Sequence, residues 1–524
     1  MKKWQILLAL LMVTVLTLTA CGESGGTGTS EGTGDAPAGE EPAGDFADSF
    51  TVAQGAEPVS LNPYGQNDQS SSRVRVQIFD NLLTQDKNME FVPGLAESWE
   101  QIDDLTVEFK LRQGVKFHNG EDFVASDVKY SIQQAIASPN TSNIVSMIDG
   151  DNIEVVDDST VRIKTFEPFG PLLAHLSHPA AAIVSESSFS AAGDDVEILP
   201  NGTGPYKLQE WVRGDAVTLE RFDDYWGEPA KTKTVVFRPI AENANRTIEL
   251  ETNQVQISYD IAPNDVARVD ENDELQLFRE PNFSTTYVGF NIQKAPLDNV
   301  LVRQAINHAV NMEEVVDVVY HGAGNKAVGP LGPNVTFANT ELEGYDYNPE
   351  KAKELLAEAG YPDGFDITIW TNENQQRMDI AEVLQNQLNQ VGIRATSEVV
   401  EWGAYLSRTA AGEHDMFILG WTTVTGDADY GLYALFHSSQ FGDAGNRTFY
   451  KNEDVDRLLD EARVSVDPAE REAKYKEVQQ IITEDAPWIF TWTGEDLTAA
   501  REGISGFELH PAGHYRLKNV TYTP

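Results

Sequence analysis

Aromatic and acidic side chains follow a predicted buried strand near residue 420. Residues 416–419 form a continuous apolar run, which is typical of a strand buried on both faces of a sheet. Trp421, Asp427 and Asp429 come directly after it, where the strand would enter a loop. Ligands of open α/β sheets bind beyond the carboxyl ends of strands. We therefore expect Trp421 to Asp429 to form a wall of a binding site; an aromatic plug followed by an ordinary solvated acidic loop is the alternative.

The chain carries no motif for bond-breaking chemistry. It contains no His-Glu-x-x-His and, from residue 46 onward, no Gly-x-Ser-x-Gly, and its single cysteine leaves the body of the protein without a thiol nucleophile. The segment 201–207, Asn-Gly-Thr-Gly-Pro-Tyr-Lys, lacks the Gly-Lys-Ser/Thr of a phosphate-binding loop, so we interpret it as a structural turn. We therefore expect a protein that is not an enzyme and needs no cofactor; a surface peptidase is the alternative.

Two histidine pairs are the candidates for a metal site. His175 with His178, and His510 with His514, are each close in sequence, but neither pair has an evident third ligand. Histidines beside prolines and glycines are more often structural than metal-bound. We expect no metal ligand here, with a metal binder as the alternative.

Length and charge restrict the class of protein. A chain of 524 residues exceeds what a single hydrophobic core supports, so we expect at least two lobes. The formal net charge of −45 excludes nucleic acid as a partner, because phosphate binding needs clustered Lys and Arg. It also disfavours adsorption to anionic lipid. An acidic surface of this kind keeps a protein soluble at high salt, so a saline or alkaline habitat is an interpretation of the charge.

The N-terminus has the pattern of a bacterial lipoprotein signal. Lys2 and Lys3 precede an apolar segment, 6–18, which is too short to span a bilayer, and Leu-Thr-Ala-Cys ends at Cys21. Residues 1–21 are thus predicted to be a signal peptide whose cleavage leaves a lipid on Cys21. Residues 22–45 are Gly, Ser, Thr, Glu, Asp, Pro and Ala without a large apolar side chain, and we interpret them as a flexible linker.

The periodicity of the body changes near residue 290. Strands predominate before it, including a half-buried strand with Val107, Phe109 and Leu111 and a hairpin over 153–163; helices are expected from Ser70 to Leu83 and over 127–137. Helices and strands alternate after it. One helix is expected to begin after the cap Asp298, and two more are expected over 348–359 and 378–390. Strands are expected at 367–370 and 393–400. This order predicts a parallel sheet, and the strand-like tail 506–524 is expected to return to the first lobe.

Several separated motifs resemble a known family. They are Asn201-Gly-Thr-Gly-Pro-Tyr, Asp224-Tyr-Trp226, Leu297-Asp-Asn-Val-Leu-Val-Arg-Gln-Ala-Ile306, Leu355-Leu-Ala-Glu-Ala-Gly-Tyr361 and Asp454-Val-Asp-Arg-Leu-Leu-Asp-Glu-Ala462. Together they resemble the family 5 extracellular solute-binding proteins of ABC importers, over residues 50–520. Glu401-Trp-Gly-Ala-Tyr-Leu with Gly420-Trp421 is similar to the dipeptide-binding branch, and Thr425-Gly-Asp-Ala-Asp-Tyr430 is similar to the glutathione-binding branch.

The resemblance implies an α/β, two-lobed periplasmic-binding-protein type II fold with an extra subdomain in the first lobe and hinge strands between the lobes. The implied boundaries are 46–287 for lobe 1, with the subdomain at about 78–200, 288–495 for lobe 2, and 496–524 for the return to lobe 1. It implies a monomer, tethered by lipid outside the cytoplasmic membrane, that captures glutathione or other short peptides and delivers them to the permease and ATPase of an ABC importer. A nickel, haem or other non-peptide binder of the same family is the alternative.

The resemblance also suggests the binding residues. Dipeptide binders of the family place an arginine ahead of the helix that precedes Gly392, which favours Arg377 as the partner of a peptide carboxylate, with a solvated arginine at the helix end as the alternative. Their aspartate after the tryptophan is Val424 here, so Asp427 or Asp429 is expected to take the ammonium group. Trp402 and Trp421 are expected to supply apolar walls, with core packing as the alternative for each.

Overall fold

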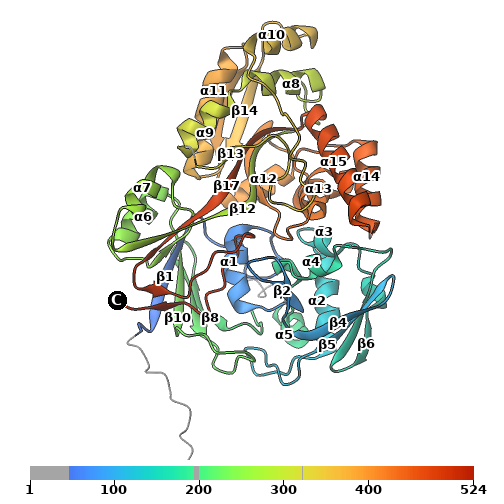
Figure 1. The fold of residues 1–524 in the computed structure, drawn as a ribbon, viewed down its shortest axis with the longest axis vertical. Coiled ribbons are helices and arrows are strands. Elements are labelled where there is room, and N and C mark those ends of the chain that lie inside the picture. The colour runs from blue at the N-terminus through green and yellow to red at the C-terminus, as the bar shows by residue number, and fades with distance from the viewer. Residues whose placement is uncertain (1–45, 194–199, 322, 466) are drawn as a thin grey trace, which may run out of the picture. The chain divides into compact units, whose positions relative to one another are not determined.

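One mixed sheet runs through the chain from its first strand to its last long one (Figure 1). The computed structural model describes residues 46–193, 200–321, 323–465 and 467–524, so the predicted signal peptide, Cys21 and linker lie outside the described residues. The order of the strands is β15 (Arg394–Val399), β14 (Asp366–Thr371), β16 (Met416–Thr422), β12 (Leu275–Phe290), β17 (Trp488–Arg501), β11 (Ile257–Ser258), β1 (Ser49–Gln54), β10 (Thr234–Pro239), β9 (Ala216–Arg221) and β8 (Tyr206–Val212), with β13 (Asn325–Lys326) beside β17.

Two long antiparallel strands, β12 and β17, occupy the centre of this sheet and lie side by side (Figure 1). Their pairing runs from Leu275 opposite Arg501 to Pro281 opposite Glu495, shifts register, and resumes from Thr285 opposite Thr493. The first part of the pair continues into β11, and the second part lies beside β16. The two strands therefore connect the N-terminal and C-terminal portions of the sheet.

The helices bury the apolar faces that the sequence predicts, as α10 illustrates. A polar cap, Asn348, and Pro349 at the first turn begin α10, which buries Ala352, Leu355 and Leu356. The helices are α1 (Gln69–Ile78), α2 (Ala125–Ala137), α3 (Ser142–Val145), α4 (Leu172–Leu176), α5 (Glu186–Ala192), α6 (Asn243–Glu251), α7 (Val266–Asp270), α8 (Val300–Ala309), α9 (Met312–Tyr320), α10 (Pro349–Glu358), α11 (Gln375–Asn389), α12 (Trp402–Ala410), α13 (Ala428–Phe436), α14 (Glu453–Val464) and α15 (Pro468–Asp485).

The smaller sheets lie in the first part of the chain and in the tail. The half-buried strand around Phe109 and the hairpin over 153–163 are both confirmed, and they pair in one antiparallel sheet. Its order is β4 (Ala96–Asp103), β5 (Thr106–Leu111), β7 (Thr160–Lys164) and β6 (Glu154–Asp157); β2 (Leu83–Gln85) pairs with β3 (Phe91–Pro93), and β18 (Ile504–Ser505) pairs with β19 (Thr521–Tyr522).

The hydrophobic core is divided into clusters that follow these portions. One cluster joins residues 50–259 to the tail, where Phe507, Tyr515 and Leu517 are buried. Two further clusters lie within 283–490, on the strands β12, β14, β16 and β17 and the helices around them. A chain of this length thus buries its apolar side chains in several cores rather than one, as expected from its size.

Three local predictions are wrong. The helix expected to run to Leu83 ends at Ile78, because Phe79 takes an extended conformation. The cap of α8 is Asn299, whose side chain accepts a hydrogen bond from the Leu301 N–H, rather than Asp298. The tail pairs as a strand only at its end, since Gln77 holds it with side-chain hydrogen bonds to the backbone at residues 515 and 517.

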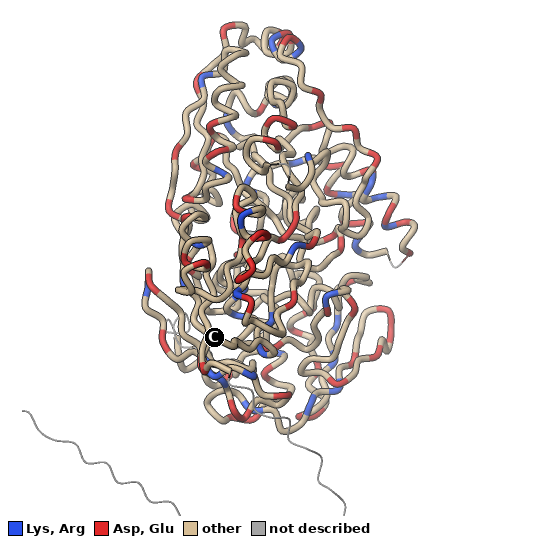
Figure 2. Tube along the Cα trace, turned by 60° about the vertical axis from the view of Figure 1, so that its left-hand side comes forward, with Lys and Arg blue, Asp and Glu red and all other residues tan. Residues whose placement is uncertain are grey.

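The predicted parallel sheet is correct for β14 with β15 and β16, but the complete sheet is mixed because β12 and β17 are antiparallel to their neighbours. Acidic side chains are distributed along the whole trace (Figure 2). Among the described residues, every helix is too short or too polar to span a bilayer.

Candidate functional site

A cavity of about 290 Å³ opens beside β12 and β17, where these strands meet α1, α11 and the end of β16. We call it the cleft. Its lining combines charged, amide and aromatic side chains, and it includes three of the residues predicted from the sequence. The residues used below are Arg73, Asp260, Asn282, Asn372, Arg377, Trp402, Gly420, Trp421, Thr422 and Asp496.

Arg377 brings a cation without an anionic partner into the cleft. Its backbone N–H is capped by the Asn374 side chain in the first turn of α11, and its Nη1 donates to Asn372 Oδ1 at 2.9 Å. No carboxylate within the described residues lies in ion-pair distance of Arg377. Burial lowers the pKa of its guanidinium, and a cation in the first turn opposes the helix dipole. The position therefore serves neither the helix nor an internal ion pair.

Glycine and tryptophan shape the space around that guanidinium. A Cβ at Gly420 would lie 3.5 Å from Arg377 Nη2, so the absence of a side chain leaves room for the cation. The Trp402 ring lies 5.6 Å from the guanidinium carbon, within the range of a cation–π contact. The structure thus brings Arg377, Trp402 and Gly420 together at one end of the cleft.

Trp421 continues this wall on β16, opposite Thr285 of β12. Its ring packs on Tyr430 at 5.1 Å between centroids. The indole N–H groups of both Trp402 and Trp421 are buried and make no hydrogen bond within the described residues. Because a buried N–H without a partner costs free energy, these two donors are suited to meet an acceptor brought by a ligand.

An arginine–carboxylate pair also lines the cleft. Arg73 on α1 is buried and donates from Nη1 and Nη2 to the two carboxylate oxygens of Asp260, at 2.7 and 2.9 Å. Burial alone would raise the pKa of Asp260, but the charge of Arg73 outweighs it and the pKa is lowered. The Asp260 side chain is still 49% exposed, so this pair faces the cleft with its charges balanced.

Asp496 on β17 presents a carboxylate oxygen with free bonding capacity. Its Oδ1 accepts from Asn282 Nδ2 at 2.8 Å, whereas Oδ2 is buried and forms no hydrogen bond to the described residues. The Tyr515 hydroxyl lies nearby without a well-directed bond. Burial raises the pKa of Asp496 to about 6. A positively charged group beside Oδ2 would therefore stabilise the ionised form.

Asp427 and Asp429 do not line the cleft. Asp427 caps α13 and pairs with Arg471 Nη2 at 2.7 Å. Asp429 is fully buried and accepts from Arg463 Nη2 and the Tyr475 hydroxyl, each at 3.1 Å, with His175 Nε2 also at 3.1 Å. Burial opposes its charge, yet Arg463 and then His175 hold the pKa of Asp429 well below its usual range. The two carboxylates connect α13 to α14, α15 and α4 instead.

The histidine pairs are engaged within the fold or face another cavity. His175 contacts the Ile144 carbonyl through Nδ1, and His178 contacts the Tyr430 hydroxyl through Nε2 and the Ala180 N–H through Nδ1. His510 and His514 line a second cavity, described below. Within the described part of the chain, no three His, Cys, Asp or Glu side chains are arranged to hold a metal ion.

Sequence reasoning missed Arg73, Asp260, Asn282 and Asp496. Arg73 lies in a predicted helix but contributes to no apolar period, and Asp260 follows a strand of two residues. The backbone at Asp260 has φ of +54°, a left-handed conformation that is uncommon for a residue with a side chain. No pattern in the sequence predicts that backbone conformation, so the place of Asp260 in the cleft becomes evident only from the structure.

Comparison with known proteins identifies a family and several relatives. The model of the bacterial extracellular solute-binding proteins, family 5, matches residues 90–443. The glutathione-binding protein GsiB of Pectobacterium atrosepticum is 35% identical over 485 residues, which cover 90% of this chain and 94% of that protein.

Two solved structures are similar over 91% of this chain. DppA of Helicobacter pylori with the peptide STSA has a TM-score of 0.87 at 30% identity, and it is covered to 99%. The dipeptide-binding protein of Pseudoalteromonas sp. SM9913 with Met-Leu has a TM-score of 0.86 at 27% identity, and it is covered completely, to 100%.

Proposed function

The chain belongs to the bacterial extracellular solute-binding proteins of family 5, and from this premise we propose that it binds a short peptide outside the cytoplasmic membrane and delivers it to an ABC importer. The similar structures confirm the predicted α/β, two-lobed type II fold. Relatives that are named for glutathione or were solved with short peptides support a peptide such as glutathione, a dipeptide or an oligopeptide. The cation of Arg377, which faces the cleft without a carboxylate partner, is the observation that carries the proposal.

Arg377 is the proposed partner of the peptide carboxylate. A peptide in water is a zwitterion, and burial of its carboxylate costs several kcal/mol unless a cation is supplied. A guanidinium offers two parallel N–H donors, and Arg377 Nη2 lies 3.5 Å from the place that a Cβ at Gly420 would take. The unbonded indole N–H groups of Trp402 and Trp421 offer further donors at the same end of the cleft.

Asp496 is the proposed partner of the peptide ammonium. By the sequence resemblance, Val424 stands where dipeptide binders of the family carry an aspartate, and Asp427 and Asp429 are paired with Arg471 and Arg463 outside the lining of the cleft. Asp496 is the lining carboxylate with a buried oxygen that lacks a hydrogen bond in the described structure, while Asp260 is already neutralised by Arg73. An ammonium beside Oδ2 would supply the missing donor and lower the pKa of Asp496 from about 6.

The peptide amides can pair with the end of β16. The neighbouring strand β14 pairs with β16 only at Met416 and Phe417, so β14 does not cover the backbone at Gly420 and Thr422, both of which line the cleft. An extended ligand can therefore add main-chain hydrogen bonds there. Closure of the two lobes about β12 and β17 would then bury the ligand, and preference for the closed form explains capture without any bond being broken.

Isothermal titration calorimetry tests the proposal with glutathione, di- to pentapeptides and Ni²⁺ against the purified mature protein. We expect a peptide to bind, and Arg377→Ala to weaken it by about 2–5 kcal/mol, which is about 30- to 5,000-fold in Kd. Arg377→Lys should retain part of the affinity, since it keeps the charge but loses the planar fork. The exposed Arg457 on α14 provides the matched control, Arg457→Ala. Binding of Ni²⁺ alone, or a peptide affinity that Arg377→Ala leaves intact, would overturn the assignment.

The proposed location is the outer face of the cytoplasmic membrane, with the protein tethered through Cys21 as a monomer. Cys21 lies outside the described residues, so this part rests on the sequence pattern of the first 21 residues. Incorporation of labelled fatty acid in the native host is expected for the full chain and absent for Cys21→Ser. Fractionation of the Cys21→Ser protein into the medium, with peptide affinity unchanged, would separate anchoring from binding.

A further inference from the structure

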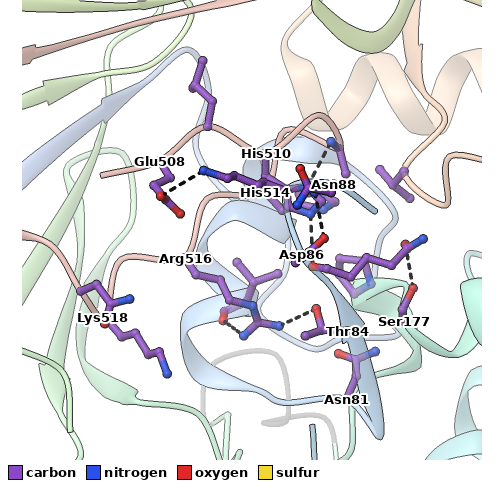
Figure 3. Close-up of a pocket in the computed structure, with 18 of the residues that line it drawn as sticks. Asn81, Thr84, Asp86, Asn88, Ser177, Glu508, His510, His514, Arg516 and Lys518 are labelled. Carbon is purple, nitrogen blue, oxygen red and sulfur yellow. Dashed lines mark hydrogen bonds and ion pairs between the residues drawn. The ribbon is translucent and has the colours of Figure 1, made fainter. Parts of the chain in front are cut away.

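A second cavity, of about 370 Å³, lies between β2, the end of α1 and the C-terminal tail (Figure 3). It shares no lining residue with the cleft. Its volume falls at the lower end of the range for small-molecule sites. The peptide proposal makes no use of this cavity, so its lining needs a separate explanation.

The tail presents basic side chains to this cavity through a strand-like alternation. Tyr515 and Leu517 are buried in the core, whereas His514, Arg516 and Lys518 alternate with them and line the cavity. Gln77 fixes this segment, because its side-chain amide donates to the Tyr515 carbonyl at 2.7 Å and accepts from the Leu517 N–H at 3.0 Å. The positions of the basic groups therefore follow from packing and not from chance exposure.

The local charge contrasts with that of the whole chain. The sequence has 83 Asp and Glu against 38 Lys and Arg, and the acidic residues are spread along the trace (Figure 2). From residue 510 to the end, the tail carries basic residues and no acidic ones. A strongly acidic chain thus ends in a segment whose charged residues are basic, and this segment borders a cavity.

The cations of this segment are only weakly neutralised. Arg516 lies 3.7 Å from Asp80 and makes long hydrogen bonds, 3.3 Å to the Val76 carbonyl and 3.4 Å to Thr84 Oγ1; Figure 3 shows it extended toward Thr84. Lys518 has no carboxylate within ion-pair distance among the described residues, and its Nζ lies 5.9 Å from the Tyr225 ring. Both groups retain donors for a ligand.

The acidic residues of the lining are already occupied. Glu508 pairs with Lys87 at 3.4 Å, and both side chains are exposed. Asp86 Oδ1 accepts the backbone N–H groups of Asn88 and Glu90, bonds that hold the pKa of Asp86 below its usual value. The remaining polar lining includes the amide side chain of Asn81, whose Nδ2 is bonded to backbone carbonyls. The Asp86 carboxylate keeps its charge and Lys87 is paired with Glu508, so Arg516 and Lys518 are the lining cations that pair with no carboxylate of the lining.

We propose that this cavity is a second binding site, for a small molecule that carries an oxyanion, either carboxylate or phosphate. Both cations line one cavity from a fixed segment, and guanidinium and ammonium groups are suited to the oxygens of such a group. The site is independent of the cleft and of the peptide that the cleft binds.

Calorimetry at low ionic strength with citrate and with inorganic phosphate tests the site in the whole mature protein, because salt screens such contacts. We expect at least one of the two to bind, and its identity distinguishes a carboxylate from a phosphate ligand. Arg516→Gln should weaken that binding about tenfold or more, and Lys518→Gln should do so without disturbing Asp80, since Lys518 has no internal ion pair.

Two controls make the result decisive. Lys353→Gln removes the same charge from an exposed position on α10 and should bind the probe as the parent does. Because Arg377 is itself proposed to take a carboxylate in the cleft, the titrations are repeated in the Arg377→Ala protein, in which the binding that Lys518→Gln removes should remain. The proposal is overturned if neither probe binds at about 10 mM, or if Lys518→Gln and Lys353→Gln bind it equally well.

Discussion

Replacement of Asp429 by asparagine discriminates between a structural and a ligand-binding carboxylate. Asp429 is fully buried, and Arg463 beside it is only 3% exposed. The guanidinium of Arg463 also stacks on the Tyr433 ring at 3.6 Å, so it has no route to water when its partner is neutralised. The Asp429→Asn protein would retain a similar shape but leave a buried positive charge uncompensated.

The expected loss of unfolding free energy is large. Removal of one partner from a buried ion pair costs about 3–5 kcal/mol, because the remaining charge keeps its desolvation penalty. The Tyr475 hydroxyl loses a charged acceptor as well, and hydrogen bonds to charged groups contribute about 1.5–3 kcal/mol, so the upper part of the range is expected. An exposed carboxylate such as Asp273 should change stability by less than about 0.5 kcal/mol when replaced by asparagine.

Chemical denaturation monitored by tryptophan fluorescence measures this loss, with peptide calorimetry on the same samples. A second variant, Asp429→Leu with Arg463→Met, removes both charges and should recover most of the stability, because Arg463 no longer leaves an unpaired buried charge. The pKa of Asp429 is depressed in the fold, so its contribution is present above about pH 4, the value of an unfolded Asp, and is lost as pH falls below it. Asp429→Asn should lack that part of the acid sensitivity.

An Asp429→Asn protein that unfolds like the parent but binds peptide far more weakly would contradict a structural role for Asp429. That result would place the ammonium partner at Asp429, as the sequence suggested, and would mean that α13 moves on binding. A double variant less stable than Asp429→Asn would also contradict it, since the uncompensated Arg463 is the stated cause of the loss.

Three other predictions follow from the same structure. Gly204→Ala should cost about 3 kcal/mol or more, because a Cβ there would lie 2.5 Å from the Ile78 carbonyl carbon, whereas Gly214→Ala, with φ of +76° and open space, should cost about 1 kcal/mol; thermal or chemical unfolding compares them. The raised pKa of Asp496 means that the ligand-free protein loses stability as pH rises from about 4 to 6, and Asp496→Asn should remove this dependence in denaturation curves. Peptide affinity should decrease as pH falls below about 6 in the parent, as Asp496 is protonated, and calorimetry at two pH values should show no such change in Asp496→Asn.

The elements with strong local signals could be predicted from the sequence. Asn348 and Pro349 mark the start of α10, and the short apolar run of β16 lies inside the sheet as expected. The prediction for the glycine-rich turn is also confirmed in kind: Gly202 and Gly204 pack directly against the carbonyl of Ile78, where any side chain would collide. These signals are local, so a single sequence suffices to read them.

The mixed sheet and the tail could not be predicted in the same way. Parallel pairing follows from β-α-β order. The partners in β12 and β17, such as Leu275 and Arg501, are far apart in sequence, and no local pattern near Leu275 predicts its pairing with Arg501. The tail alternates like a strand, yet Gln77 supplies the bonds that a neighbouring strand would provide. Partners that are distant in sequence decide both features.

The candidate site likewise contains residues that local motifs predicted and residues whose role depends on partners distant in sequence. Arg377, Trp402 and Trp421 were suggested by family motifs next to a strand or helix end, and the structure places all three in one cavity; their contacts with a ligand stay predictions. Asp427 and Asp429 follow the same strand in sequence, but each forms an ion pair with an arginine of a later helix, on α15 and α14 respectively. In a protein with 83 acidic residues, a carboxylate near a site says little, since what matters is whether a cation within the fold has already taken it. Asp496 has a carboxylate oxygen without a hydrogen bond in the described structure. The peptide ammonium should therefore be sought at β17 and not in the loop after Trp421.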